Sequence, residues 1–146
     1  MRILARPDLS RRTTLRLGGS ALSEIVVEQG RDWERVSSFV DREGGRLFVL
    51  GRGSNILADS GEIPVHLLRY AGLRGIRIVE EGKDALSLRV GAQAKLSGLV
   101  SRSARLGLSG LEGLVGIPGT VGGAVAMNAG SFGCEIGLVL DRVECW

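Results

Sequence analysis

Hydrophobic and polar positions divide the chain into short segments with strand-like and helix-like patterns. Apolar, β-rich runs predict strands at residues 23–28, 46–50, 64–69, 75–80 and 85–91. The polar stretch at residues 81–84 predicts a hairpin connection between the last two of these strands. Residues 11–19 alternate and then stop at a glycine pair, which predicts a short strand or extended arm entering a turn.

Other segments carry apolar residues at helical spacing. One face of a helix from Trp33 to about Arg42 is apolar; we expect Asp32 to cap this helix and Gly44 to end it. A second helix is expected from Lys95 to about Arg105. Shorter helical pieces are expected around residues 110–115 and 121–127, followed by a strand at residues 139–145.

The order of these elements indicates the α+β fold class, with several mixed strands and about three helices. Regular alternation of strands and helices is absent, which argues against a Rossmann fold. The loop at residues 51–55 lacks the third glycine of GxGxxG, and the chain has no GxxxxGK[ST] motif.

Composition fits a globular protein with unusual backbone demands. The chain has 146 residues, 44% hydrophobic and 24% charged, which allows one domain, or one domain plus an incomplete piece of another. Its 23 glycines are about twice the average share of ~7%. So many glycines predict sharp bends or close approach of the backbone to something else.

Several function classes are not expected. The net charge of +3 is scattered and aromatic residues are few, so we expect no nucleic-acid partner. Cys134 and Cys145 have no CxxC or Cys/His spacing, which predicts reduced thiols, no metal site and a cytoplasmic protein. No apolar window is long enough for a membrane span, and the N-terminus does not fit a signal peptide.

The first candidate binding feature is the loop that follows the strand at residues 46–50. Its residues are Gly51, Arg52, Gly53, Ser54 and Asn55. Small residues directly after a strand expose consecutive backbone N–H groups, and such a nest holds phosphate oxygens, with Ser54 and Asn55 adding side-chain donors. An ordinary tight turn is the alternative interpretation of these five residues taken alone.

The second candidate feature is a glycine-rich segment at residues 116–124, followed by residues 127–130. Pro118 restricts one turn, and the glycines allow backbone amides to approach a planar or anionic ligand. The helix that follows would then direct its N-terminus at that ligand. Close packing of helices through small residues is the alternative.

Four single residues have side chains that are chemically suited to binding or catalysis. Arg16, beside a glycine pair, is either a phosphate contact or a solvated surface residue. His66, the single histidine, is expected to have a structural role in its strand rather than a catalytic one. Glu112 and Glu135 are expected to be capping or surface charges.

Three stretches together resemble one family. They are Thr13–Gly19, Leu50–Asp59 and the long segment Gly107–Ile136. In this order they resemble the flavin domain of the UDP-N-acetylenolpyruvoylglucosamine reductases (MurB family), over nearly all of residues 10–146. The resemblance implies the FAD-binding, PCMH-type fold of vanillyl-alcohol oxidase-like flavoproteins, in which two small α+β subdomains, here about 1–70 and 71–146, enclose the cofactor.

The same resemblance implies site residues. The loop Gly51–Asn55 would embrace the FAD pyrophosphate. The segment along the flavin side would supply Ile117, Pro118, Gly119, Thr120, Gly122 and Gly123, and Asn128 would support the same pocket. Arg52 stands where a glycine is usual in the family, and either adds a phosphate contact or weakens the close approach of the backbone.

The implied reaction belongs to peptidoglycan synthesis. In the family, NADPH reduces the flavin, and the reduced flavin gives a hydride to UDP-N-acetylglucosamine enolpyruvate. A tyrosine and arginine motif and the C-terminal substrate-binding domain, with its serine and glutamate, are absent from this sequence. We therefore expect a truncated or separately encoded flavin domain that is inactive alone, and no catalytic residue is assigned.

Two other hypotheses remain open at this point. The chain is alternatively a catalytically incompetent flavin- or nucleotide-binding module that acts with a partner chain, or another oxidoreductase of the same superfamily. A missing domain would leave apolar surface near Ile136–Val143, which a homodimer would cover.

Overall fold

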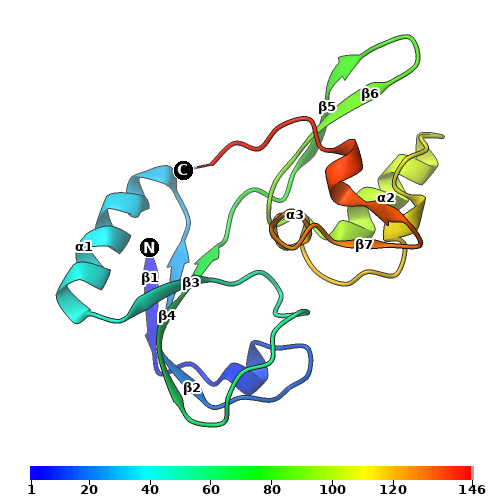
Figure 1. The fold of residues 1–146 in the computed structure, drawn as a ribbon. Coiled ribbons are helices and arrows are strands. Elements are labelled where there is room, and N and C mark those ends of the chain that lie inside the picture. The colour runs from blue at the N-terminus through cyan, green and yellow to red at the C-terminus, as the bar shows by residue number, and fades with distance from the viewer. Residues whose placement is uncertain (146) are drawn as a thin grey trace. The chain divides into compact units, whose positions relative to one another are not determined.

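The computed structural model describes residues 1–145, and the chain divides into two compact units, Met1–Gly72 and Leu73–Trp146. Both helices and strands are present in each, which confirms the α+β class (Figure 1). Each unit has its own buried core.

A four-stranded mixed sheet forms the first unit. Its strands are β1 (Arg2–Ala5), β2 (Ser20–Val27), β4 (Glu62–Tyr70) and β3 (Arg46–Val49), in that spatial order. β1 runs antiparallel to β2, whereas β2 and β3 both run parallel to β4. The helix α1 (Trp33–Glu43) connects β2 to β3, and two 3-10 turns, η1 (Leu9–Arg11) and η2 (Gly30–Asp32), complete the unit (Figure 1).

Neighbouring residues of β4 bury against different clusters, because successive side chains of a strand point to opposite faces. On one face α1 packs on the sheet through Ile25, Val27, Val36 and Leu68. On the other face η1 and the segment after β3 pack on it through Leu9, Ala21, Leu50 and Leu67. The first unit is therefore a sheet covered on both sides.

An irregularity in β2 changes which residues face which cluster. The register shifts between Ala21 and Ser23, so Ala21 faces the η1 side while Ile25 faces α1. Between these two pairs β2 advances by two residues while β4 advances by three, so the extra residue lies in β4, and the alternation of β2 is reversed beyond this point. Glu24, between two residues of the α1 face, consequently lies on the η1 side.

The second unit combines a hairpin with short helices. Its hairpin strands are β5 (Ile76–Glu81) and β6 (Leu86–Val90), and its remaining elements are α2 (Leu96–Arg105), η3 (Glu112–Leu114), α3 (Val121–Ala126), β7 (Gly130–Ser131), β8 (Cys134–Glu135) and η4 (Ile136–Val139). Their shared core contains Ala94, Leu96, Leu99, Leu114, Val121, Ala124 and Ile136.

Most of the predicted elements are confirmed. The strands at 23–28, 46–50, 64–69, 75–80 and 85–91 correspond to β2, β3, β4, β5 and β6, with small differences at the ends. The helices predicted from Trp33 and from Lys95 correspond to α1 and α2, and the helical pieces after residue 110 to η3 and α3. Gly44 ends α1 with a φ of +71°.

The predicted strand at residues 139–145 and the strand alternative for residues 11–19 are both wrong. Residues 11–19 form the end of η1 and a turn in which Arg16 has a φ of +55°, because the segment folds back on neighbouring loops instead of pairing along its length. Residues 139–145 contain the end of η4 and then irregular chain; within residues 1–145 no strand pairs with them. Apolar alternation alone makes a strand only where a partner edge exists.

The predicted cap of α1 needs a correction of detail. Asp32 is the N-cap residue of α1, but its carboxylate makes no capping bond to this helix. It accepts hydrogen bonds from the Met1 ammonium at 3.0 Å and from the backbone N–H groups of Glu28 and Gln29. Asp32 therefore joins the chain start to the end of β2.

Candidate functional site

The loop Gly51–Asn55 and the turn at residues 12–19 form one structural feature. The backbone N–H of Thr14 donates to the Gly53 carbonyl at 2.9 Å. Gly53 has a φ of +66°, and a Cβ atom there would lie 2.1 Å from the Arg12 carbonyl oxygen. Only glycine fits, so this position is determined by the protein's own backbone as well as by any ligand.

A second contact extends the same arrangement. Gly19 donates its N–H to the Asp59 carbonyl at 2.6 Å, and a Cβ atom at Gly19 would lie 2.0 Å from the Gly61 carbonyl oxygen. Thr13, which is buried, donates its hydroxyl to the Leu17 carbonyl at 2.9 Å and closes the turn. The first two stretches of the family resemblance therefore lie against each other in the folded unit.

The loop Gly51–Asn55 keeps donors available. Within residues 1–145, the N–H groups of Gly51, Arg52 and Gly53 donate to no protein acceptor. The side chains of Arg52 and Asn55 are exposed and have no hydrogen-bond or ion-pair partner in that range. Unpaired N–H groups beside a cationic side chain suit an anionic ligand such as a pyrophosphate.

The glycine-rich segment before α3 differs, because its N–H groups are already used. Val121 and Gly122 donate to the carbonyls of Ala94 and Ala92 at 2.9 and 2.8 Å. Gly123 donates to the hydroxyl of Thr120, the N-cap of α3, at 3.2 Å. The N–H groups of residues 121–123 are therefore used inside the second unit, and the expectation that this helix directs its N-terminus at a ligand stays a prediction.

Several glycines of the long motif are explained by packing inside the second unit. A Cβ atom would lie 2.3 Å from Cys134 Cβ at Gly113, 2.9 Å from Ala92 Cβ at Gly122, and 2.4 Å from the Cys134 carbonyl at Gly130. The alternative of close packing through small residues accounts for these positions. Gly119 has a φ of +128°, and its carbonyl accepts from the Leu96 N–H.

Asn128 has a clear structural role in the segment that follows α3. It adopts a φ of +44°, its side-chain amide donates to Glu135 at 2.6 Å, and its side-chain oxygen accepts from the Gly137 N–H at 3.1 Å. Both ends of the side chain thus stabilise the β7–β8 hairpin and the start of η4. Glu135 is exposed, as expected of a surface charge, and is the partner of Asn128 in this contact.

The single histidine is structural, as the sequence predicts. His66 is buried, with its Nε2 2.6 Å from the Gly44 carbonyl and its Nδ1 2.8 Å from the Ser23 hydroxyl. The carbonyl only accepts, so Nε2 carries the proton and Nδ1 accepts from Ser23. The Phe39 ring packs against the imidazole edge to face.

The positions of Glu112 and Arg16 are compatible with the roles predicted from the sequence. The Glu112 carboxylate accepts from the backbone N–H of Gly110 at 2.7 Å, and hydrogen bonds from the N–H groups of Glu112 and Gly110 lower its pKa. Glu112 is exposed, as expected of a surface charge, and Leu111 rather than Glu112 is the N-cap residue of η3. Arg16 is exposed, and its role toward phosphate stays a prediction.

Sequence reasoning missed the charged cluster around Glu24. Glu24 is 3% exposed, and its carboxylate accepts hydrogen bonds from Arg12 Nε and Arg69 Nη1, both at 2.7 Å. Burial acts to raise the pKa of Glu24, but the two arginines outweigh it and the net pKa is lowered. The available signal was a single acid inside the apolar run Ala21–Val27.

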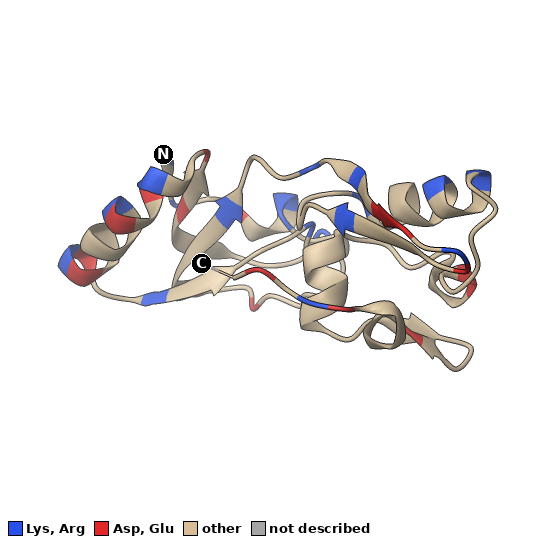
Figure 2. Cartoon of the chain, turned by 90° about the horizontal axis from the view of Figure 1, so that it is seen from above, with Lys and Arg blue, Asp and Glu red and all other residues tan. Residues whose placement is uncertain are grey.

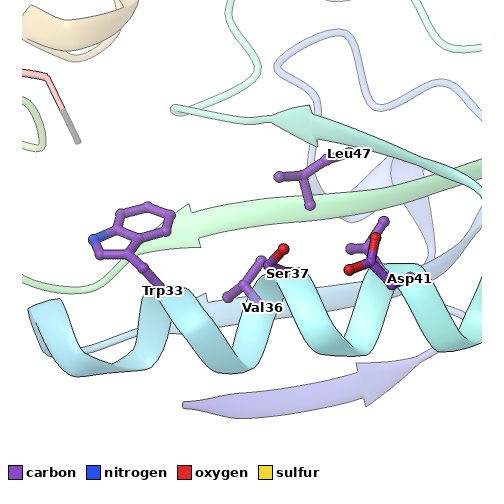
Figure 3. A pocket seen from close by; sticks show the side chains of 6 residues that line it. Trp33, Val36, Ser37, Asp41 and Leu47 are labelled. Atoms are coloured by element: carbon purple, nitrogen blue, oxygen red, sulfur yellow. The ribbon is translucent and has the colours of Figure 1, made fainter.

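One open hollow in the first unit is unrelated to the candidate cofactor residues. It has a volume of about 270 Å³ and lies between α1 and Leu47 of β3, with Trp33, Val36 and Asp41 along its helix side (Figure 3). None of residues 51–55 lines it. Acidic and basic residues alternate along α1 without a run of one sign (Figure 2).

Two kinds of feature are absent from residues 1–145. Among residues 1–145, no helix combines the length and apolar character needed to cross a bilayer. The same part of the chain holds no group of three or more His, Cys, Asp or Glu side chains arranged around a common point for a metal.

Comparisons with known proteins agree on one family. Residues 22–145 match the family model described as FAD binding domain. A UDP-N-acetylenolpyruvoylglucosamine reductase from Nitratidesulfovibrio vulgaris is 48% identical over 144 residues, covering 99% of this chain and 49% of that protein. The reductase of the same name from Oleidesulfovibrio alaskensis is 47% identical, over 97% of this chain and 48% of that protein.

A solved structure shows the same similarity. The crystal structure of UDP-N-acetylenolpyruvylglucosamine reductase (MurB) from Thermus caldophilus matches with a TM-score of 0.70 and 39% identity, covering 92% of this chain and 45% of that one. The chain thus spans about half the length of the curated relatives it matches.

Proposed function

Because the chain belongs to the FAD binding domain family, we propose that it binds FAD as the flavin-carrying half of a UDP-N-acetylenolpyruvoylglucosamine reductase. The expected cofactor, FAD, agrees with this family. The observation that carries the proposal is the 48% identity to such a reductase over 99% of this chain. The loop at residues 51–55 supports it with available N–H donors.

The residues of the first unit fit the phosphate part of FAD. Gly51, Arg52, Gly53, Ser54 and Asn55 would hold the pyrophosphate through backbone N–H groups, aided by the Arg52 guanidinium and the Asn55 amide. Gly53 keeps the loop in place by packing on the Arg12 carbonyl.

The residues of the second unit would act differently toward the flavin. Ile117, Pro118, Gly119, Thr120, Gly122 and Gly123 would contact it through packing of small and apolar groups, because the first N–H groups of α3 are used inside the protein. Asn128 would support this region indirectly, by holding Glu135 and Gly137.

The activity proposed for the whole enzyme is the NADPH-dependent reduction of UDP-N-acetylglucosamine enolpyruvate, a step of peptidoglycan synthesis. Bound FAD supplies the hydride chemistry, and the protein supplies binding and orientation. No catalytic residue of this chain is assigned, and we propose that the chain requires the remaining part of the enzyme for turnover. A cytoplasmic location belongs to this proposal, because NADPH and UDP-sugars are cytoplasmic metabolites.

The hypothesis of a catalytically incompetent module acting with a partner chain is not favoured, since the matching relatives are reductases. A homodimer through apolar surface is a separate proposal. Of the predicted surface at residues 136–143, Ile136 is instead buried in the core of the second unit. Leu138, Val139, Leu140 and Val143 are between 40% and 74% exposed, and association would cover them. Sedimentation velocity that shows only a monomer at high protein concentration would contradict it.

The visible absorption spectrum tests FAD binding most directly. The purified chain is incubated with FAD, desalted and scanned; retained bands at about 370 and 450 nm, as protein-held flavins show, are expected. Arg52→Ala is expected to weaken FAD binding about tenfold, as loss of a charged hydrogen bond does. Arg46→Ala, which removes another exposed arginine just before the loop, is the matched control. A colourless protein would contradict FAD binding by this chain.

A further inference from the structure

Glu24 is a buried charge in the centre of β2. Its side chain is only 4% exposed, and the neighbouring strand residues Ile25 and Val27 are fully buried. An ionised carboxylate in such a place persists only when other groups pair with it. Arg12 donates two N–H groups to Oε2, and Arg69 donates one to Oε1.

The two arginines differ in what they connect. Arg69 lies on β4, opposite Val26 of β2, so the sheet already holds it beside Glu24. Its side chain is 40% exposed, and its guanidinium donates to Glu24 Oε1. Arg69 alone would offset only part of the free-energy cost of burying the Glu24 carboxylate.

Arg12 lies outside the sheet, directly after η1, and its side chain is 24% exposed. Its guanidinium donates to the Glu24 carboxylate. Its backbone carbonyl packs against Gly53, because a Cβ atom on Gly53 would lie 2.1 Å from the Arg12 carbonyl oxygen. Two residues later the Thr14 N–H donates to the Gly53 carbonyl. One residue therefore connects the buried carboxylate to the support of the loop.

We propose that Glu24 is a positioning residue for the loop Gly51–Asn55. By holding the Arg12 guanidinium, Glu24 fixes the backbone of residues 12–14 against Gly53 and thereby the direction of the loop N–H groups. The consequence for flavin rests on the proposed function, in which these groups bind the FAD pyrophosphate. Glu24 itself does not contact the cofactor in this proposal.

Glu24→Gln tests the first step without flavin, with Arg69→Gln as the matched control. Glutamine keeps the shape of the side chain but removes the charge that holds Arg12. Hydrogen exchange of the Thr14 amide, measured by NMR on the full chain, is expected to become roughly tenfold faster in Glu24→Gln and to stay unchanged in Arg69→Gln. Equal rates in the wild type and Glu24→Gln, or equal acceleration in both variants, would overturn the proposal.

The second measurement compares FAD with riboflavin, which carries the isoalloxazine without the pyrophosphate. Glu24→Gln is expected to weaken FAD binding about tenfold and to leave the dissociation constant of riboflavin unchanged. Equal loss of both ligands would mean that Glu24 only maintains the fold. Failure of the wild type to bind FAD would contradict the proposed function, whereas the Thr14 exchange rates would still decide the role of Glu24.

A further variant keeps the proposal testable if Glu24→Gln does not fold. Arg12→Lys retains the positive charge but replaces two N–H donors on Oε2 by one ammonium group. Thr14 exchange is expected to accelerate in this variant too, by a smaller factor than in Glu24→Gln. A folded Arg12→Lys protein with wild-type Thr14 exchange would overturn the proposal.

Discussion

The backbone N–H of Thr14 donates a hydrogen bond to the carbonyl of Gly53, with 2.9 Å between nitrogen and oxygen. These residues are far apart in sequence, and each belongs to a different stretch of the family resemblance. Their contact makes the turn at residues 12–19 the support of the candidate pyrophosphate loop. Substitutions near Thr14 or Gly53 are therefore expected to change the conformation of the loop Gly51–Asn55.

Gly53→Ala is expected to destabilise the first unit strongly, and Gly44→Ala is its matched control. Both glycines have a φ near +70°, but a Cβ atom meets the Arg12 carbonyl at Gly53 and nothing within 4 Å at Gly44. Gly44→Ala should cost about 1–3 kcal/mol from backbone strain alone. Gly53→Ala should cost roughly a further 2 kcal/mol from the clash, measured by urea unfolding. Equal losses would show that the Arg12 backbone moves aside freely.

Asn55→Ala and Asn128→Ala are expected to have opposite signatures. Asn55 is exposed without a protein partner, so its loss should leave stability unchanged and weaken FAD binding. Asn128 has a positive φ, and its side chain bonds to Glu135 and to the Gly137 N–H. Its replacement by alanine should therefore lower the free energy of unfolding by about 1–2 kcal/mol. Thermal unfolding and FAD titration of both proteins check this, and a stability loss in Asn55→Ala would argue that the loop is only a structural turn.

His66→Gln is expected to destabilise the protein by about 1–3 kcal/mol without a specific effect on flavin affinity. The substitution disturbs a buried group whose two ring nitrogens bind Gly44 and Ser23. Ser38→Ala, on the exposed face of α1, is a suitable control because its hydroxyl bonds only to the carbonyl one turn earlier. Denaturant unfolding measures the difference, and an unchanged midpoint for His66→Gln would contradict the structural role.

The free energy of unfolding at low pH is expected to depend on the ionisation of Asp32. Hydrogen bonds from the Met1 ammonium and the Glu28 N–H lower the pKa of Asp32 from 3.8 to about 2. A lowered folded-state pKa stabilises the protein above the unfolded-state pKa, and the effect is lost as pH falls through the folded-state value. Stability should therefore decline between about pH 4 and pH 2, and Asp32→Asn should remove this part of the decline. Urea unfolding across that range measures it; parallel pH profiles of the two proteins would contradict the assignment.

Local pattern by itself determined most of the elements and the family. The apolar face from Trp33 to Val40 predicted α1, and the strand patterns predicted β2 to β6, because periodicity records which side of an element is buried. The long motif at residues 107–136 identified the flavin domain, since its order of glycines is specific. Both kinds of information lie in neighbouring residues.

Only the tertiary structure decided how the glycines and charges are used. A glycine in the sequence shows that room is needed, but not whether a ligand or the protein's own backbone fills it; Gly53 meets Arg12, and Gly122 meets Ala92. The donors of α3 and the partners of Glu24 likewise come from distant segments. Hydrogen bonds and close approaches between such segments depend on how the chain folds back on itself, which local periodicity does not encode.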